Sequence, residues 1–234
     1  MSKWSISRIN SLLELAEKRN YLEIGVEHGN TFFAIEADLK VAVDPAFRFD
    51  FKSRSNPTEM FFQSTSDLFF SQIQDEAFLF DVIFLDGLHN FSQTYSDLMN
   101  ALNVLSPSGY ILIDDVFPSD EFSFMPIQSD AYSERAKSIA PARLMDFSWH
   151  GDVFKVISLI HDYHQELHYR TFWDLDSNPQ TVVWFDYPEN RIRRFGGIEF
   201  ISNLKYKDVL LNQDILHSCT YFEIMDTLRN LKST

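Results

Sequence analysis

The sequence predicts a doubly wound α/β fold, with a seven-stranded, mostly parallel sheet, helices on both faces and an antiparallel pair of strands at one edge. Short apolar segments alternate along the chain with segments of helical periodicity. Residues 21–45 have the pattern of strand, helix and strand, a unit that joins parallel strands by a right-handed crossover. The run Phe80–Leu85 is apolar at almost every position, which is typical of a strand covered on both faces.

The first elements follow from apolar spacing and turn residues. Apolar residues recur at helical spacing from Ile6 to Ala16, and Asn20 can end this helix. Tyr21–Gly25 is a short apolar strand that leads into a glycine turn. Thr31–Ala37 is predicted to be helical, and Leu39–Pro45 is a second strand that its proline ends.

The alternation of strands and helices continues to residue 113. Its predicted elements are a weak strand Met60–Gln63, a helix Asp67–Gln74, the strand Phe80–Leu85, a helix from Ser92 to Leu105 that Ser106–Gly109 stops, and a strand Tyr110–Ile113.

Beyond Asp115 the alternation breaks. Residues 116–150 are rich in Ser, Pro, Asp and Phe without clear periodicity, and a connection of this length predicts a lid or an acceptor-binding insertion. The remaining predicted elements are a helix Asp152–Gln165, two antiparallel strands Leu167–Asp174 and Thr181–Phe185, and a helical segment Tyr206–Leu231.

Composition limits the class of protein. Cys219 is the single cysteine, which excludes an internal disulfide framework and a Cys-rich zinc site and favours a reducing compartment. The N-terminus has no apolar leader, and no run reaches the roughly 20 apolar residues of a membrane span, so we expect a soluble, cytoplasmic protein. A net charge of −14 argues against nucleic acid as a partner. The 23 phenylalanines indicate no more than core packing and an apolar lid.

The carboxyl ends of the first two strands predict a nucleotide site. Glu23 and Gly25 lead into a turn that Gly29 closes, where backbone N–H groups at the start of a helix can receive an anionic group. Asp44 follows Glu23 by about 20 residues, the spacing expected of an acid that holds ribose hydroxyls. In the alternative interpretation, the glycines are turn residues and Asp44 caps a loop.

Polar residues also follow the later strands. Ser66 and Asp67 follow the third, Asp86 the fourth, and Asp114 and Asp115 the fifth. The last three carboxylates should converge, and they repel one another unless a positive charge compensates. Their oxygens suit Mg²⁺, Ca²⁺ or Mn²⁺, although structural caps at strand ends are an equal alternative.

Four stretches together resemble a known family: Leu22-Glu23-Ile24-Gly25-x-x-x-Gly29-x-Thr31, Val43-Asp44-Pro45, Phe80 to His89, and Gly109 to Asp115. They are similar to class I S-adenosylmethionine-dependent methyltransferases, and more narrowly to the bacterial methyltransferase-24 type with an FIDGLH signature, which is related to the catechol O-methyltransferase-like enzymes. Trp149 to Lys155 resembles a W-x-G-D-V-W-K element of some members. The resemblance covers roughly residues 20–160.

The resemblance implies a Rossmann-like fold in a single domain over residues 1–234. Its parts would be an N-terminal helix (1–20), a cofactor-binding core (21–115), a lid or acceptor insertion (116–150), and a C-terminal part with a helix, the edge strands and a helical tail (151–234).

The resemblance also implies how S-adenosylmethionine binds. The methionine part would be surrounded by Glu23, Gly25, Gly29 and Thr31. Asp44 would hold the ribose hydroxyls, Ser66 and Asp67 would meet the adenine, and Asp86 would also line the cofactor site.

The sequence differs from the family pattern at the positions of the metal ligands, the base and the glycine-rich turn. Asp86, Asp114 and Asp115 fall on the Mg²⁺ positions of the catechol-type enzymes, with Asp115 in place of an asparagine. His89 stands where those enzymes have a general-base lysine, which leaves the base open. Glu27 replaces the middle glycine of the common glycine-rich turn.

The implied reaction is O-methylation of a small hydroxylated acceptor, with a sugar as one candidate. A divalent cation would lower the acceptor's pKa and His89 would take the proton. A non-catalytic protein that binds S-adenosylmethionine or a nucleotide, and an NAD-dependent oxidoreductase, are the alternatives; the lack of G-x-G-x-x-G spacing counts against the second. A small molecule is the expected partner, a membrane is not, and the oligomeric state is left open, a homodimer included.

Overall fold

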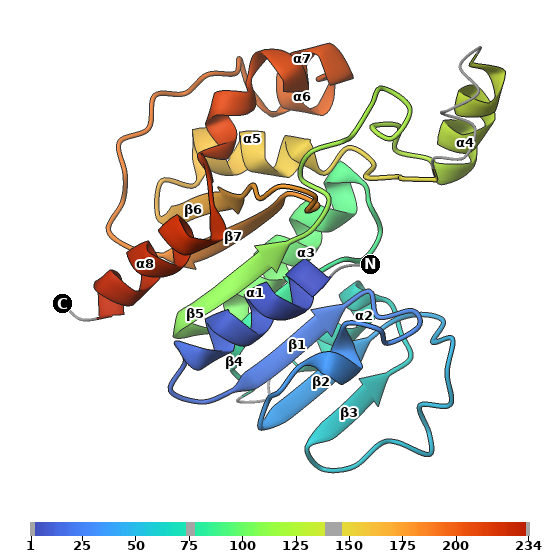
Figure 1. Cartoon of the computed structure of the whole chain (residues 1–234), viewed down its shortest axis with the longest axis vertical. Coiled ribbons are helices and arrows are strands. Elements are labelled where there is room, and N and C mark those ends of the chain that lie inside the picture. The colour runs from blue at the N-terminus through green and yellow to red at the C-terminus, as the bar shows by residue number, and fades with distance from the viewer. Residues whose placement is uncertain (1–2, 74–77, 139–146, 233–234) are drawn as a thin grey trace.

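A computed structural model of the chain describes residues 3–73, 78–138 and 147–232. One mixed sheet lies between two layers of helices (Figure 1). The strands of the described residues are β1 (Asn20–Ile24), β2 (Leu39–Val43), β3 (Glu59–Phe62), β4 (Phe80–Leu85), β5 (Leu105–Ile113), β6 (Leu167–Phe172), β7 (Gln180–Phe185) and β8 (Ser218–Cys219). Their spatial order is β3-β2-β1-β4-β5-β7-β6-β8.

The helical elements connect these strands and cover the sheet. They are α1 (Lys3–Glu14), the 3₁₀ turn η1 (Phe32–Ala34), α2 (Ser66–Ile73), α3 (Phe91–Asn103), α4 (Gln128–Lys137), α5 (Phe154–Tyr163), α6 (Ile198–Ser202), α7 (Tyr206–Leu211), the 3₁₀ turn η3 (Gln213–Leu216) and α8 (Tyr221–Lys232).

The core lies on both faces of the sheet, as the apolar run of β4 predicts. Ile83 and Leu85 pack in the cluster that includes α2, α3 and α5, whereas Val82 and Phe84 pack in the cluster that includes α1 and α8. Alternate residues of one strand point to opposite faces, so an all-apolar strand must be covered twice. The doubly wound fold class is therefore confirmed.

The sheet topology confirms the predicted strands and adds one. Strands β1 to β5 pair in parallel, and β7 is antiparallel to both β5 and β6. The short β8 pairs in parallel with β6 and makes an eighth strand where seven were expected. It falls inside the segment Tyr206–Leu231, so the prediction of one helix there is wrong: the left-handed backbone of His217 (φ 47°) separates η3 from β8, and α8 begins only at Tyr221.

Two other boundaries differ from the sequence prediction. The helix expected over Thr31–Ala37 is a single 3₁₀ turn, because Ile35 is already extended (φ −83°, ψ 132°). Residues Ser106–Gly109 do not form a loop but belong to β5, whose first residue, Leu105, pairs with Phe80 before a bulge. Gln74 of the predicted helix Asp67–Gln74 and residues 139–146 of the predicted insertion lie outside the described residues.

Many of the phenylalanines form a cluster beside β3. Phe32, Phe33, Phe47, Phe49 and Phe61 contact one another with ring centroids 4.9 to 6.4 Å apart. These rings cover the end of the sheet where β3 has no further strand. Among the described residues, no helix is long and apolar enough to cross a membrane.

Candidate active site

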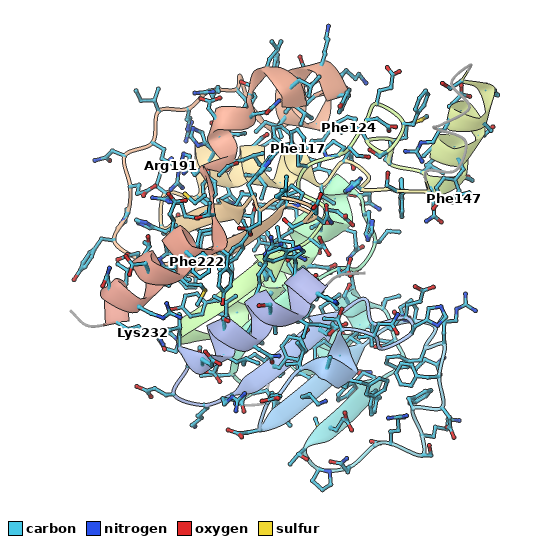
Figure 2. The ribbon with its side chains drawn as sticks, viewed as in Figure 1. Phe117, Phe124, Phe147, Arg191, Phe222 and Lys232 are labelled. Atoms are coloured by element: carbon cyan, nitrogen blue, oxygen red, sulfur yellow. The ribbon has the colours of Figure 1, made fainter. Side chains whose placement is uncertain are left out.

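A cavity of about 580 Å³ opens at the carboxyl ends of β1, β2 and β4. Helix α4 stands away from the sheet, on the side toward which the parallel strands point (Figure 1), and its residues Gln128 and Tyr132 line the cavity with Phe147 (Figure 2). A cavity of this size can hold a nucleotide-sized ligand. Of the residues predicted from the sequence, the lining contains Glu23, Gly25, Thr31, Asp44, Ser66, Asp67, Asp86 and His89.

The turn after β1 needs glycine for close contact between two loops. Gly25 has φ +89°, and a Cβ there would lie 2.0 Å from the carbonyl oxygen of Asp86. Glu27 occupies the position of the missing glycine and adopts the left-handed conformation (φ 43°) that glycine takes at little cost. Gly29 does not line the cavity. A Cβ on it would lie 2.3 Å from the Phe33 ring, so a glycine here leaves room for the phenylalanine cluster.

Asp44 holds the same turn from the end of β2. Its Oδ2 accepts hydrogen bonds from the N–H groups of Val26 (2.9 Å) and Glu27 (2.8 Å), and its Oδ1 accepts one from Ala46 (2.7 Å). The carboxylate also lines the cavity, so any contact with a ribose would use its remaining lone pairs. Asp44 therefore stabilises the turn. The sequence analysis gave this structural role as the alternative to ligand binding.

Ser66 and Asp67 lie at the start of α2, on the cavity wall next to α3. Gln93 of α3 donates from Nε2 to Asp67 Oδ1 (3.1 Å) and to Asp97 Oδ1 (3.0 Å). Asp97 also lines the cavity, and burial raises its pKa. It was not among the site residues predicted from the sequence. These groups offer hydrogen-bond acceptors of the kind that an adenine amino group requires.

The cavity wall is acidic. Among the residues that the structure describes, its lining includes six carboxylates and neither lysine nor arginine; the carboxylates are those of Glu23, Glu27, Asp44, Asp67, Asp86 and Asp97. Burial raises the pKa of Glu23 well above its ordinary value, although Tyr21 donates a 2.6 Å hydrogen bond to its Oε2. A cationic ligand would relieve this concentration of negative charge, whereas an anionic one would increase it.

His89 joins two of the three predicted metal carboxylates. Its Nε2 lies 3.3 Å from Asp86 Oδ1, and its Nδ1 lies 2.9 Å from Asp115 Oδ2 and 3.1 Å from the carbonyl oxygen of Trp149. Because both ring nitrogens face acceptors, the arrangement suits the doubly protonated imidazolium.

The pKa shifts in this cluster agree with that charge state. Burial lowers the pKa of His89, but the charge of Asp115 and hydrogen bonds to Asp115 and Asp86 raise it well above the ordinary value. Burial raises the pKa of Asp86 to about 6, despite the opposing effect of His89. Burial also tends to raise the pKa of Asp115, yet its pairing with His89 brings it below the ordinary value.

Asp114 lies beside Asp115 but is not part of the group that Asp86, His89 and Asp115 form. Its Oδ1 accepts hydrogen bonds from Asn178 Nδ2 (2.7 Å) and from the backbone N–H of Asp115 (2.8 Å). Burial, followed by the charges of Asp115 and Asp86, raises the pKa of Asp114 well above its ordinary value. Neither Asp114 nor Asp115 lines the cofactor cavity directly.

A divalent cation would fit the cluster of Asp86, His89 and Asp115. One ligand atom from each lies within 4.8 Å of the others, and the set combines two carboxylates with an imidazole. Burial raises the pKa of Asp86, and a cation bound beside it would favour its ionised form. His89, and not Asp114, groups with Asp86 and Asp115. As a ligand His89 would have to be neutral and could not also act as the base, and its nitrogen would suit Mn²⁺ and later transition metals better than Mg²⁺.

The segment from Trp149 to Lys155 forms the wall behind His89. The Trp149 ring stacks on the His89 ring, with centroids 4.8 Å apart and planes 18° apart. Gly151 has φ +59°, and a Cβ there would lie 1.5 Å from the His89 carbonyl oxygen. Asp152 accepts a 2.7 Å hydrogen bond from the N–H of Phe91 and pairs with Lys155. The resemblance assigned this element no role. In the structure it holds the loop after β4 in place.

Two residues beside Asp115 were not predicted as site residues. Asn178, in the β6–β7 connection, donates to Asp114 and also to Asp115 Oδ1 (2.8 Å), and His150 Nε2 lies 3.8 Å from Asp115 Oδ1. His150 belongs to the element Trp149–Lys155, but the contact of either residue with Asp115 depends on long-range packing.

Comparison with known proteins agrees with this geometry. Residues 22–116 match the sequence model of a family described as "Methyltransferase domain". No curated protein sequence matches the chain.

Several solved structures share the fold at low sequence identity. An O-methyltransferase from Bacillus cereus in complex with S-adenosylhomocysteine has a TM-score of 0.55 and 15% identity, over 80% of this chain and 82% of the other. The O-methyltransferase TomG from Streptomyces achromogenes, in complex with S-adenosylmethionine, has a TM-score of 0.53 and 15% identity, over 79% and 81%. The S-adenosylhomocysteine-bound methyltransferase PaMTH1 from Podospora anserina has a TM-score of 0.51 and 16% identity, over 80% of each chain. Residues 22–116 are therefore similar in sequence to a methyltransferase domain, and the chain shares its fold with three solved structures of methyltransferases.

Proposed function

We propose that this protein transfers the methyl group of S-adenosylmethionine to a hydroxyl oxygen of a small acceptor, with assistance from a divalent cation. The observation that carries the proposal is the acidic cavity at the strand ends, whose described lining has six carboxylates and no lysine or arginine. S-adenosylmethionine carries a sulfonium and an ammonium group, so this wall favours it.

The same wall argues against a dinucleotide. A pyrophosphate brings two negative charges and is normally received by closely spaced glycines at a helix N-terminus. Here the turn contains Glu27, and the helical segment that follows is only the single turn Phe32–Ala34. An NAD-dependent reaction is therefore the weaker alternative.

The chain's own residues would position the cofactor in a defined order along the sheet. Glu23, Gly25 and Thr31 would face its methionine part, Asp44 its ribose, and Ser66 and Asp67 its adenine; all line one cavity. When bound, S-adenosylmethionine supplies a methyl group for in-line displacement, so the protein's main task is to align the acceptor oxygen with it.

His89 is the candidate base, but its present partners oppose that role. An imidazolium paired with Asp86 and Asp115 has no lone pair to accept a proton. A cation held by Asp86 and Asp115 would supply charge that favours an ionised acceptor hydroxyl. Any change that withdraws these two carboxylates from His89 lowers its pKa toward the ordinary value and frees it to accept the acceptor's proton.

Calorimetry tests the cofactor. S-adenosylhomocysteine should bind with a dissociation constant on the order of micromolar, and NAD should give no heat under the same conditions. Failure of S-adenosylhomocysteine to bind would remove the methyltransferase proposal. Release of S-adenosylhomocysteine with a panel of hydroxylated acceptors then separates an enzyme from a non-catalytic binding protein.

Metal assistance has a separate test. Asp86→Asn should abolish stimulation of methyl transfer by Mg²⁺ or Mn²⁺, and EDTA should have the same effect on the unchanged protein. The matched control is Asp50→Asn, in an exposed loop away from the cavity. Full activity in EDTA would withdraw the metal and leave the methyltransferase proposal intact.

A further inference from the structure

The turn after β5 contains a strained residue. Asp115 lies two residues beyond the end of β5 and adopts the left-handed conformation (φ 59°), although it is not a glycine and is only 8% exposed. This conformation costs free energy for a residue with a side chain, so the surrounding structure must hold it. The adjoining Asp114 adds a second carboxylate, which repels the first. We therefore expect a group at this turn that holds both carboxylates.

Asn178, in the β6–β7 connection, is that group. Its Nδ2 donates to Asp114 Oδ1 (2.7 Å) and to Asp115 Oδ1 (2.8 Å). The two hydrogens of an amide NH₂ lie in one plane, so these hydrogen bonds fix the direction of one carboxylate relative to the other. The backbone N–H of Asp115 also donates to Asp114 Oδ1 (2.8 Å). Asn178 thus stabilises the left-handed turn from a position 63 residues further along the chain.

This hold on Asp115 extends to His89. Because Asn178 binds Oδ1 of Asp115, the other oxygen, Oδ2, faces His89 Nδ1 at 2.9 Å. The second ring nitrogen of His89 lies 3.3 Å from Asp86, and the ring stacks on that of Trp149 with centroids 4.8 Å apart. Asn178 therefore sets the rotation of a carboxylate that helps to orient the His89 ring.

The Asn178 side chain is itself constrained by its neighbours. Pro179 follows it, and a residue before proline is largely confined to extended backbone conformations. The amide is oriented by its two contacts, because the NH₂ group and not the oxygen must face acceptor oxygens. The contact with the two carboxylates is therefore built into the connection.

We infer that Asn178 is a positioning residue for methyl transfer, which fixes the Asp115 carboxylate and through it the His89 ring. The inference rests on the proposed function, in which His89 and the carboxylates of Asp86 and Asp115 act on the acceptor hydroxyl. A displacement of about 1 Å in a catalytic site can lower a rate about a hundredfold, so the orientation that Asn178 imposes should affect turnover.

A purely structural role for Asn178 predicts a different result. Its hydrogen bonds also join the β6–β7 connection to the end of β5, so their removal lowers stability in either case. Ser177 provides the comparison. Its Oγ accepts a hydrogen bond from Arg8 (2.9 Å) and donates one to the carbonyl oxygen of Asp174 (2.9 Å). Ser177→Ala therefore weakens the same connection without releasing Asp115.

The test observes His89 directly, in the full chain labelled with ¹⁵N-histidine and kept in EDTA. His89→Gln assigns the Nδ1–H signal of this residue among those of the seven histidines. Asp115→Asn gives the position of that signal without the carboxylate. Because Nδ1 also lies 3.1 Å from the carbonyl oxygen of Trp149, the signal should move in the variants and not vanish.

We expect Asn178→Ala to move the His89 signal most of the way to its position in Asp115→Asn, and Ser177→Ala to leave it unchanged. Asn178→Gln, whose amide lies one methylene group further from the backbone, should move the signal in the same direction; it replaces Asn178→Ala if that variant does not fold. Affinity for S-adenosylhomocysteine should stay within about twofold in the Asn178 and Ser177 variants, because neither residue lines the cofactor cavity.

Kinetics provide the second measurement. With a hydroxylated acceptor that the panel identifies, Asn178→Ala should lower kcat about tenfold to a hundredfold, while the KM for S-adenosylmethionine changes by less than about twofold. Ser177→Ala should leave kcat and KM within about twofold of the unchanged protein. Where the panel yields no acceptor, the histidine signal decides alone.

The outcomes separate this inference from the proposed function. An unchanged His89 signal in the Asn178 variants, an equal movement in Ser177→Ala, or an unchanged kcat overturns the positioning role even where S-adenosylhomocysteine binds normally. Failure of the unchanged protein to bind S-adenosylhomocysteine overturns the proposed function instead, and the positioning role for methyl transfer falls with it.

Discussion

The cavity at the ends of β1, β2 and β4 and a cleft lined by Phe117, Trp173 and the β6–β7 connection lie on opposite sides of Asp115, yet they are built differently. Cavity residues such as Glu23, Asp44 and Asp86 lie at the carboxyl ends of the neighbouring parallel strands β1, β2 and β4, so one edge of the sheet brings them together. The cleft is assembled by contacts between distant segments, such as Arg8 with Asp174 and Asn178 with Asp114. Substitutions should therefore affect the two regions separately.

The largest effect is expected at Arg8, which supports only the cleft. Its guanidinium is fully buried, pairs with Asp174 at 3.1 Å and donates to the carbonyl oxygen of Asn178 and to Gln180 Oε1. Arg8→Met leaves buried acceptors unpaired and should lower the free energy of unfolding by about 3–5 kcal/mol in urea denaturation. The exposed neighbour Lys3→Met should change it by less than about 0.5 kcal/mol.

If the regions are independent, the folded fraction of Arg8→Met keeps its affinity for S-adenosylhomocysteine within about twofold by calorimetry. A loss of tenfold or more would show that the hairpin also supports the cofactor cavity.

Gly25 should be the most sensitive position of the cavity. A Cβ at 2.0 Å from a backbone oxygen cannot be accommodated by a side-chain movement, and φ +89° adds strain. Gly25→Ala should destabilise the protein by on the order of 3 kcal/mol and abolish S-adenosylhomocysteine binding. Gly196→Ala, where the nearest atom is 4.0 Å away and φ is not positive, should leave stability and binding unchanged.

Asp44→Asn should perturb the same turn less than Gly25→Ala does. The amide can accept only some of the three backbone hydrogen bonds, and its NH₂ group opposes an N–H donor. We expect S-adenosylhomocysteine to bind about tenfold to a hundredfold more weakly, a loss of about 1.5–3 kcal/mol. Equal affinity for the variant would show that Asp44 neither shapes the turn nor contacts the ribose.

The smallest effect concerns His89 at the boundary between the regions. Its folded pKa lies above the unfolded value of about 6.5, so its contribution to stability is complete below that pH and is lost as pH rises through the folded pKa. The difference in unfolding free energy between the unchanged protein and His89→Gln should therefore shrink by about 1 kcal/mol between acidic and alkaline pH. His28→Gln, on a ring that is more than half exposed, is the matched histidine control.

NMR titration of the His89 ring checks the cause. Asp115→Asn should lower its pKa, since the charge of Asp115 is the largest effect that raises it. A His89 pKa at or below the ordinary value in the unchanged protein would contradict the imidazolium bridge.

Sequence patterns predicted the fold class and most of the cavity because both depend on local order. Alternating strands and helices require a parallel sheet, and the carboxyl ends of parallel strands meet at one edge. Glu23, Asp44, Asp67 and Asp86 could thus be placed together before their contacts were known. The prediction failed where tertiary contacts decide, as in Gly29, which packs against Phe33 instead of lining the cavity.

The sequence by itself determined the doubly wound sheet, the glycine turn and the acidic strand ends, since apolar periodicity and turn chemistry act over a few residues. Only the tertiary structure decided that His89 bridges Asp86 and Asp115, that Asp114 turns instead to Asn178, and that Trp149 stacks on His89. The contacts with Trp149 and Asn178 join segments 60 and 64 residues apart, and no local pattern constrains which distant side chain satisfies a buried charge.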